Sequence, residues 1–98
     1  MRPVRLADAA LDDIETQVPT DRVHDFRQFD LRPAMETLAA DSPSAADICV
    51  PHGPGWRASL NGRSVGGFHL FVASDEVDPR PGALVIYAID VWLDEFPA

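Results

Sequence analysis

The residues with the clearest capacity for chemistry lie in one stretch of the chain that contains no carboxylate. No Asp or Glu occurs between Asp47 and Asp75, but two histidines and two arginines do: His52, Arg57, Arg63 and His69. Guanidinium groups bind phosphate, and imidazole can donate or accept a proton near neutral pH. We therefore expect Arg57 and Arg63 to contact nucleic acid, and His52 and His69 to act as catalytic acid or base. A structural explanation stands beside this one, because buried strands also exclude carboxylates.

The single cysteine favours a structural role. Cys49 is the one Cys of the sequence, which excludes a disulfide within it and fits a reducing compartment. A lone Cys is usually a small buried side chain. The spacing of Cys49, His52 and His69 matches no zinc pattern. We expect neither a metal nor a cofactor.

Composition limits the class of protein. The 98 residues carry a formal net charge of −8, and their eight basic residues are all Arg. This charge opposes broad attraction to nucleic acid or to an anionic membrane. The length suits one domain over residues 1–98. No apolar run approaches the roughly 20 residues that span a bilayer, and residues 1–4 lack the apolar core of a signal peptide. We expect a cytoplasmic protein with no membrane contact.

The pattern of residues 56–93 predicts an antiparallel β-meander. Asn61-Gly62 separates two β-prone runs, residues 56–60 and 63–73, and is typical of a type I′ hairpin turn. Gly66-Gly67 indicates a bulge in the second run. A polar loop over residues 74–82 leads to a third run, residues 83–93.

Alternation assigns the side chains of these runs to two faces. In the second strand Phe68, Leu70 and Val72 share one face, and His69, Phe71 and Ala73 share the other. In the third strand Leu84, Ile86 and Ala88 alternate with Val85, Tyr87 and Ile89. A strand that is apolar on both faces is expected to be central or covered.

The first half of the chain predicts a short strand over residues 4–6 and then helices. Asp8 is expected to cap a helix over residues 8–18, and Pro19 to end it. A second helix from Thr20 would bury Val23, Phe26 and Phe29, and Pro33 implies a break at which Asp30 caps a third helix. The predicted fold is α+β: an N-terminal strand and two to three helices packed on a three- to four-stranded antiparallel β-meander.

This order of elements resembles the RelE/ParE toxin superfamily of bacterial toxin–antitoxin systems. The resemblance rests on residues 4–14 (VRLADAALDDI), 38–43 (LAADSP), 55–60 (GWRASL) and 83–89 (ALVIYAI). It implies a toxin that binds a cognate antitoxin, and either cuts mRNA on the ribosome or inhibits gyrase. Arg57 matches the basic residue on the first hairpin strand of that family. Tyr87 lies near the position of its C-terminal aromatic residue and joins the catalytic candidates.

A second interpretation keeps the fold without the activity. The acidic balance, and Asp90 to Glu95 in place of a basic ending, are also compatible with a non-catalytic protein-interaction module, an inactivated toxin relative. Its acidic helical face would meet a partner protein, and a homodimer fits either interpretation. An acidic mimic of nucleic acid is a third option. The sequence leaves open whether the protein is an enzyme.

Overall fold

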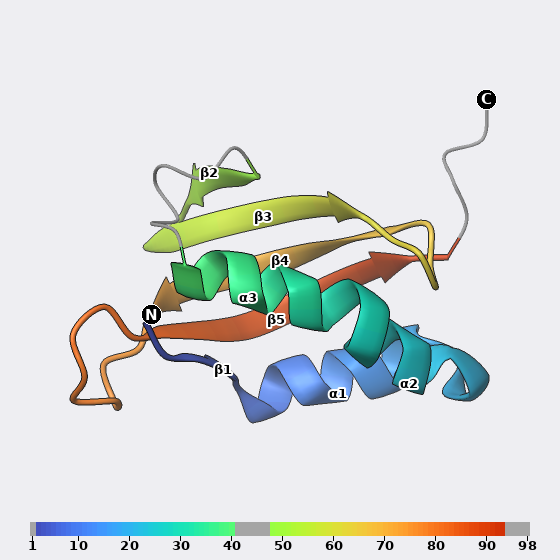
Figure 1. The fold of residues 1–98 in the computed structure, drawn as a ribbon, viewed down its shortest axis with the longest axis horizontal. Coiled ribbons are helices and arrows are strands. Elements are labelled where there is room, and N and C mark those ends of the chain that lie inside the picture. The colour runs from blue at the N-terminus through green and yellow to red at the C-terminus, as the bar shows by residue number, and fades with distance from the viewer. Residues whose placement is uncertain (1, 41–47, 94–98) are drawn as a thin grey trace.

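The computed structural model describes residues 2–40 and 48–93, in which five strands form one mixed sheet (Figure 1). The strands are β1 (Val4–Leu6), β2 (Cys49–His52), β3 (Gly55–Asn61), β4 (Gly67–Ser74) and β5 (Leu84–Trp92). Their order across the sheet is β1-β5-β4-β3-β2. Strands β2 to β5 pair antiparallel, while β1 lies parallel to β5. The predicted α+β class is confirmed, and the predicted sheet is confirmed in part. Strands β2 to β5 form a four-stranded antiparallel run, and the N-terminal strand β1 joins the same sheet parallel to β5, which makes the sheet five-stranded and mixed.

Two helical segments connect β1 to β2. The first is α1 (Asp8–Gln17), whose N-cap is Ala7 with no side-chain hydrogen bond, so the predicted Asp8 cap is wrong and Asp8 begins the helix. The second is a continuous helical run, made of η1 (Thr20–Arg22), α2 (Val23–Asp25), η2 (Phe26–Leu31) and α3 (Arg32–Ala40). Figure 1 shows α1 beside β5 and α3 across the sheet.

The hydrophobic core lies between the helices and one face of the sheet. Phe26 meets Phe68 of β4 edge to face, with ring centroids 5.2 Å apart. Such pairs add to the free energy gained from burying both rings. Leu70 and Val72 of the same strand are fully buried, as the alternation predicted. Helices therefore cover one face of the sheet, and the other face carries His69 and Phe71.

Pro33 is accommodated by a π-helical turn and not by a break. Segment η2 is a π-helix, closed by a hydrogen bond from Arg32 N–H to the carbonyl of Arg27. Proline has no backbone N–H to donate, and its ring clashes with the carbonyl one turn back. A wider turn just before the proline helps to accommodate both effects. The extra residue also rotates the following side chains. As a result Phe29 is half exposed, contrary to the predicted apolar face.

Asp30 is a buried anchor for the loop between β3 and β4, not a helix cap. Its carboxylate accepts hydrogen bonds from the backbone N–H of Arg63 at 2.8 Å and of Ser64 at 3.0 Å. The side chain belongs to the helical layer, and the loop connects two strands of the sheet. Asp30 therefore ties these two layers together at one end of the fold.

The loop that Asp30 holds has five residues, 62–66, and the predicted type I′ turn is wrong. Strands β3 and β4 pair up to Asn61 and Gly67, and neither Asn61 nor Gly62 has a positive φ. Gly62 is needed for space: a Cβ there would lie 2.3 Å from the carbonyl oxygen of Val65. The predicted bulge at Gly66-Gly67 is also wrong, because Gly66 lies in the loop and Gly67 begins β4.

The irregularity of the sheet lies instead at Tyr87 of β5. Phe71 pairs with Ala88 and Val72 pairs with Ile86, which leaves Tyr87 as an extra residue opposite β4. A bulge of this kind shifts the alternation by one residue. Ile89 consequently points into the core, where it is fully buried like Ile86, so the strict alternation predicted for this strand ends at the bulge.

The edge of β5 beyond β1 is completed by helix α1. Strand β1 pairs with residues 84–86, and no other strand of the described residues lies beside the rest of β5 on that side. Asp13 accepts a hydrogen bond from the N–H of Ile89, and Gln17, one turn later, bonds the carbonyl of Ile89 and the N–H of Val91. These side chains satisfy backbone groups that would otherwise form an open edge.

Arg5 and Asp75 join β1 to the far end of β4. Two hydrogen bonds link the guanidinium of Arg5 to the carboxylate of Asp75, whose side chain is buried. The hydrogen bond from Arg5 holds the pKa of Asp75 below its ordinary value. Because the ionised form is favoured in the folded state, the pair stabilises the fold at neutral pH, and this contribution is lost as the pH falls through the lowered pKa.

The anchoring role of Asp30 can be tested by substitution. Asp30→Ala leaves two backbone N–H groups without their charged acceptor and should lower the free energy of unfolding by about 2–4 kcal/mol. Asp30→Asn keeps one acceptor oxygen and should lose less. Urea unfolding measures both variants, with exposed Asp25→Ala as the matched control. An Asp30→Ala protein as stable as the control would show that the anchor contributes nothing.

Candidate functional site

The face of the sheet that no described helix covers brings together four of the five predicted site residues. Arg57 and Ser59 alternate with buried Ala58 along β3, and Phe71 and His69 lie opposite them on β4. Cross-strand neighbours share a face of the sheet. His52 of β2 and Tyr87 of β5 reach the same face, because their rings lie beside that of Phe71, with centroid separations of 5.0 and 6.2 Å. We call this surface the open face.

Arg63 lies elsewhere, although the sequence grouped it with Arg57. It is exposed in the loop 62–66 and lines a small hollow with Arg22 and Leu93 at the end of the sheet. The backbone of Arg63 is fixed by Asp30, and its side chain is not part of the open face. The carboxylate-free stretch of sequence therefore contributes one arginine to the open face and one to the loop.

His69 is the best-positioned titratable group on the open face. Its Nδ1 atom lies 2.8 Å from the hydroxyl oxygen of Ser59, within hydrogen-bonding distance. Partial burial, and then the positive charge of Arg57, lower the pKa of His69 below its ordinary value, while the carboxylate of Asp90 acts in the opposite direction. The imidazole is therefore neutral at pH 7 and can accept a proton.

Arg57 places a cation beside this imidazole. Its Nε atom is buried and has no hydrogen-bond partner among the described residues. A buried donor of this kind is uncommon and costs free energy. The side chain as a whole is half-buried and also carries two terminal NH₂ groups, and guanidinium groups bind phosphate and carboxylate oxygens well.

Aromatic rings surround these polar groups. The ring of Trp92 lies against His69, with centroids 4.8 Å apart, and Phe71 is 6.3 Å from His69 on the other side. Together with His52 and Tyr87 they form a band of rings across β2, β4 and β5. Such rings provide flat apolar surfaces on which unpaired bases stack.

No metal site is present in the described part of the chain. Within residues 2–40 and 48–93 there is no group of three His, Cys, Asp or Glu side chains that could hold an ion. Cys49 is half-buried against the core, and burial raises the pKa of its thiol. The thiolate is therefore disfavoured. No helix of the described segments has the length and apolar character needed to cross a membrane.

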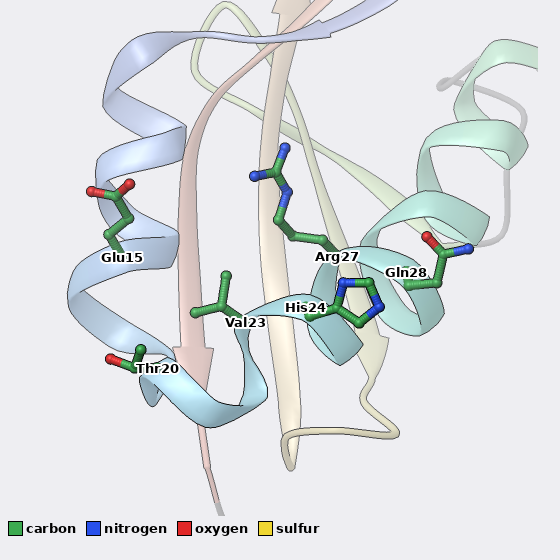
Figure 2. Close-up of a pocket in the computed structure, with 6 residues that line it drawn as sticks. All are labelled: Glu15, Thr20, Val23, His24, Arg27 and Gln28. Atoms are coloured by element: carbon green, nitrogen blue, oxygen red, sulfur yellow. The ribbon is translucent and has the colours of Figure 1, made fainter.

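A hollow of about 750 Å³ lies on the helical side, away from these groups. Figure 2 shows Glu15 on α1 and Arg27 on η2 at its two sides, with Val23 between them and His24 beside Gln28. Arg27 also lines a second hollow, whose other residues are mostly apolar: Val4, Leu6, Leu31, Arg32, Met35, Glu36 and Ala39. None of the predicted site residues lines either hollow. The helical side therefore offers a surface for binding, whereas the acid–base groups lie on the open face.

Comparisons with known proteins add no relative. No protein-family model matches the chain, and no curated protein or solved structure matches it significantly. The resemblance to the RelE/ParE superfamily therefore stays a prediction.

Sequence reasoning missed Ser59 and Asp90. Ser59 lies opposite His69, and His69 lies opposite Asp90. Only the register of three strands brings these residues together, and the predicted two-residue turn would have paired Ser59 with Ser64 instead. The spacing of Arg57 and Ser59 on one strand was the available signal, since residues two apart share a face.

The electrostatics of the open face can be tested by titrating His69. We expect a pKa below about 6.5 for this imidazole, the ordinary value for His. Arg57→Gln removes a repelling charge and should raise this pKa, and Asp90→Asn removes an attracting one and should lower it further. NMR titration of the ring protons measures each value, with Arg63→Gln as the control that leaves His69 unchanged. A pKa that does not respond to Arg57→Gln would contradict the coupling.

Proposed function

We propose that the protein is a RelE/ParE-like toxin of a bacterial toxin–antitoxin system, and that its open face binds RNA. The observation that carries the proposal is the convergence of Arg57, His52, His69 and Tyr87 on that face. These residues come from four different strands, and neither their spacing nor their order in the sequence requires them to meet. A ribosome-dependent mRNA endonuclease fits this set of groups better than a gyrase inhibitor, which needs no acid or base.

Each residue has a role that its position supports. Arg57 would bind the scissile phosphate through its guanidinium, which also offsets charge that develops during cleavage. His69, neutral at pH 7, would take the proton of the attacking 2′-hydroxyl, and His52 would protonate the leaving oxygen. Tyr87 and Phe71 would stack on unpaired bases beside the phosphate.

The distribution of charge supports RNA binding at this face despite the net charge of −8. The exposed carboxylates of the helical layer include Asp8, Asp12, Glu15, Asp25 and Glu36. The open face carries Arg57 and two imidazoles, with Asp90 as its carboxylate near His69. Free RNA is repelled at long range, so affinity should be weak in solution. The ribosome, which positions the mRNA, and a cognate antitoxin are the partners this proposal implies.

The alternative is a non-catalytic interaction module that binds a partner protein through its helical side. The two hollows that meet at Arg27 favour it, because one has an apolar lining and both are rimmed by charged side chains. Mixed apolar and charged hollows of this kind are typical of protein-binding surfaces. In this case the open face would have no role in binding, and its residues could be replaced without loss of affinity for the partner protein.

Two arginines of the same sequence stretch provide a matched test. We expect expression of the wild-type protein to arrest bacterial growth, and Arg57→Ala to abolish this arrest, because it removes the phosphate-binding cation. Arg63→Ala should leave growth arrest intact, because Arg63 lies off the open face. In filter binding with single-stranded RNA, Arg57→Ala should also flatten the slope of log affinity against log salt by about 0.7.

Three results would contradict the toxin proposal. They are harmless expression of the wild-type protein, an equal effect of the two substitutions, and unchanged mRNA in ribosome-bound form. If harmless expression coincided with a partner protein whose binding is lost in Arg27→Glu and kept in Arg57→Ala, the interaction module would replace it.

A further inference from the structure

Ser59, His69 and Asp90 form a row across three adjacent strands of the open face. Ser59 on β3 is the cross-strand partner of His69 on β4, and His69 is the partner of Asp90 on β5. The hydroxyl of Ser59 is 2.8 Å from Nδ1 of His69. Asp90 is close enough for its charge to act on the imidazole. A hydroxyl, an imidazole and a carboxylate thus follow one another in space.

This order of groups is the one that activates a serine hydroxyl. A serine is a weak nucleophile on its own, and a base within hydrogen-bonding distance makes it reactive. The negative charge of Asp90 near the imidazole stabilises the imidazolium that forms when His69 takes the proton. With the proton on Nε2, the Nδ1 atom of His69 accepts the hydrogen bond that Ser59 donates. The nitrogen roles are exchanged relative to the usual serine hydrolases, but the logic is the same.

We propose that Ser59 is the nucleophile of an acyl-transfer site that hydrolyses small carboxylic esters with an apolar acyl group. His69 is its general base, and Arg57, which lies two residues before Ser59 on the same face, is the cation for the oxyanion. This activity goes beyond the proposed action on RNA, in which the nucleophile is a 2′-hydroxyl and Ser59 forms no bond.

The reaction balances with water as the only other reactant. The oxygen of Ser59 bonds to the ester carbonyl carbon while its proton passes to Nδ1 of His69. The C–O bond to the alcohol then breaks, and His69 gives the proton to the departing alkoxide. Water, deprotonated by His69, attacks the acyl-serine, and the carboxylic acid leaves as Ser59 regains its proton. No electrons are transferred.

The class of substrate follows from what surrounds Ser59 and His69. The ring of Trp92 lies beside His69, and Phe71 lies beyond it on the same strand as His69. These rings offer an apolar surface to an acyl group. The oxyanion would fall near the guanidinium of Arg57, which lies on the same face two residues before Ser59. Small esters suit the site, because none of the three hollows described above is lined by residues of the open face.

The test uses the purified full-length chain without ribosomes or RNA, so that its outcome is independent of the toxin proposal. A fluorophosphonate probe should form a covalent adduct that mass spectrometry places on Ser59. p-Nitrophenyl acetate should show a burst of p-nitrophenol followed by slow turnover. Ser59→Ala should lose both signals, and His69→Gln should slow both by about 100-fold, as expected for loss of a general base. Ser74→Ala, at the exposed end of β4, is the matched control and should behave as the wild type.

The pH dependence provides a second measurement that needs no variant. If His69 must be neutral to accept the proton, labelling should rise with pH and reach half its maximum below about 6.5. The other titratable groups that face the site are His52, Tyr87 and Asp90, together with permanently charged Arg57. The proposal is overturned if Ser59 is not labelled, or if Ser59 and Ser74 are labelled equally. It is also overturned if folded His69→Gln reacts as fast as the wild type, or if labelling has no midpoint in that range.

Discussion

The cross-strand pairing of β3, β4 and β5 decides which side chains meet on the open face. Asn61 pairs with Gly67 across a five-residue loop, and this register places Ser59 opposite His69 and Arg57 opposite Phe71. A slip by one residue would turn each of these side chains into the core. The buried carboxylate of Asp30 holds the loop through two backbone N–H groups, so the helical layer helps to fix the register of the sheet. The bulge at Tyr87 completes the arrangement, because it brings this ring to the open face while Ile89 stays inside.

The same architecture separates the charges. Helices cover one face of the sheet, so their exposed carboxylates point away from the open face. Carboxylates used within the fold are paired with specific groups: Asp13 with the edge of β5, Asp30 with a loop, and Asp75 with Arg5. The Nε atom of Arg57 has no such partner in the described residues. A strongly acidic protein can therefore present one cation beside two imidazoles, and this local arrangement matters more at contact distance than the net charge.

The elements that follow simple periodicity could be predicted from the sequence. Those in which a tertiary contact or an irregular turn overrides a local preference could not. The alternation of Phe68, Leu70 and Val72 predicted the buried face of β4. The two-residue turn predicted at Asn61-Gly62 is wrong, because the hydrogen bonds from the loop to Asp30 favour a longer loop over the local turn preference. Pro33 suggested a break, but a π-helical turn absorbed it within a continuous helical run. The meeting of the site residues depended on register, which brought four of the five predicted residues to one face, whereas Arg63 falls in the loop.

The central claim is that the open face, and not the helical side, is where the protein meets its substrate. The most direct measurement is an NMR titration of the isotopically labelled protein with a short single-stranded RNA. The account predicts that shifts concentrate on the amides of residues 55–61 and 67–73 and on the imidazoles of His52 and His69. Shifts confined to Glu15, Val23 and Arg27 on the helical side, or no shifts at millimolar RNA, would contradict it.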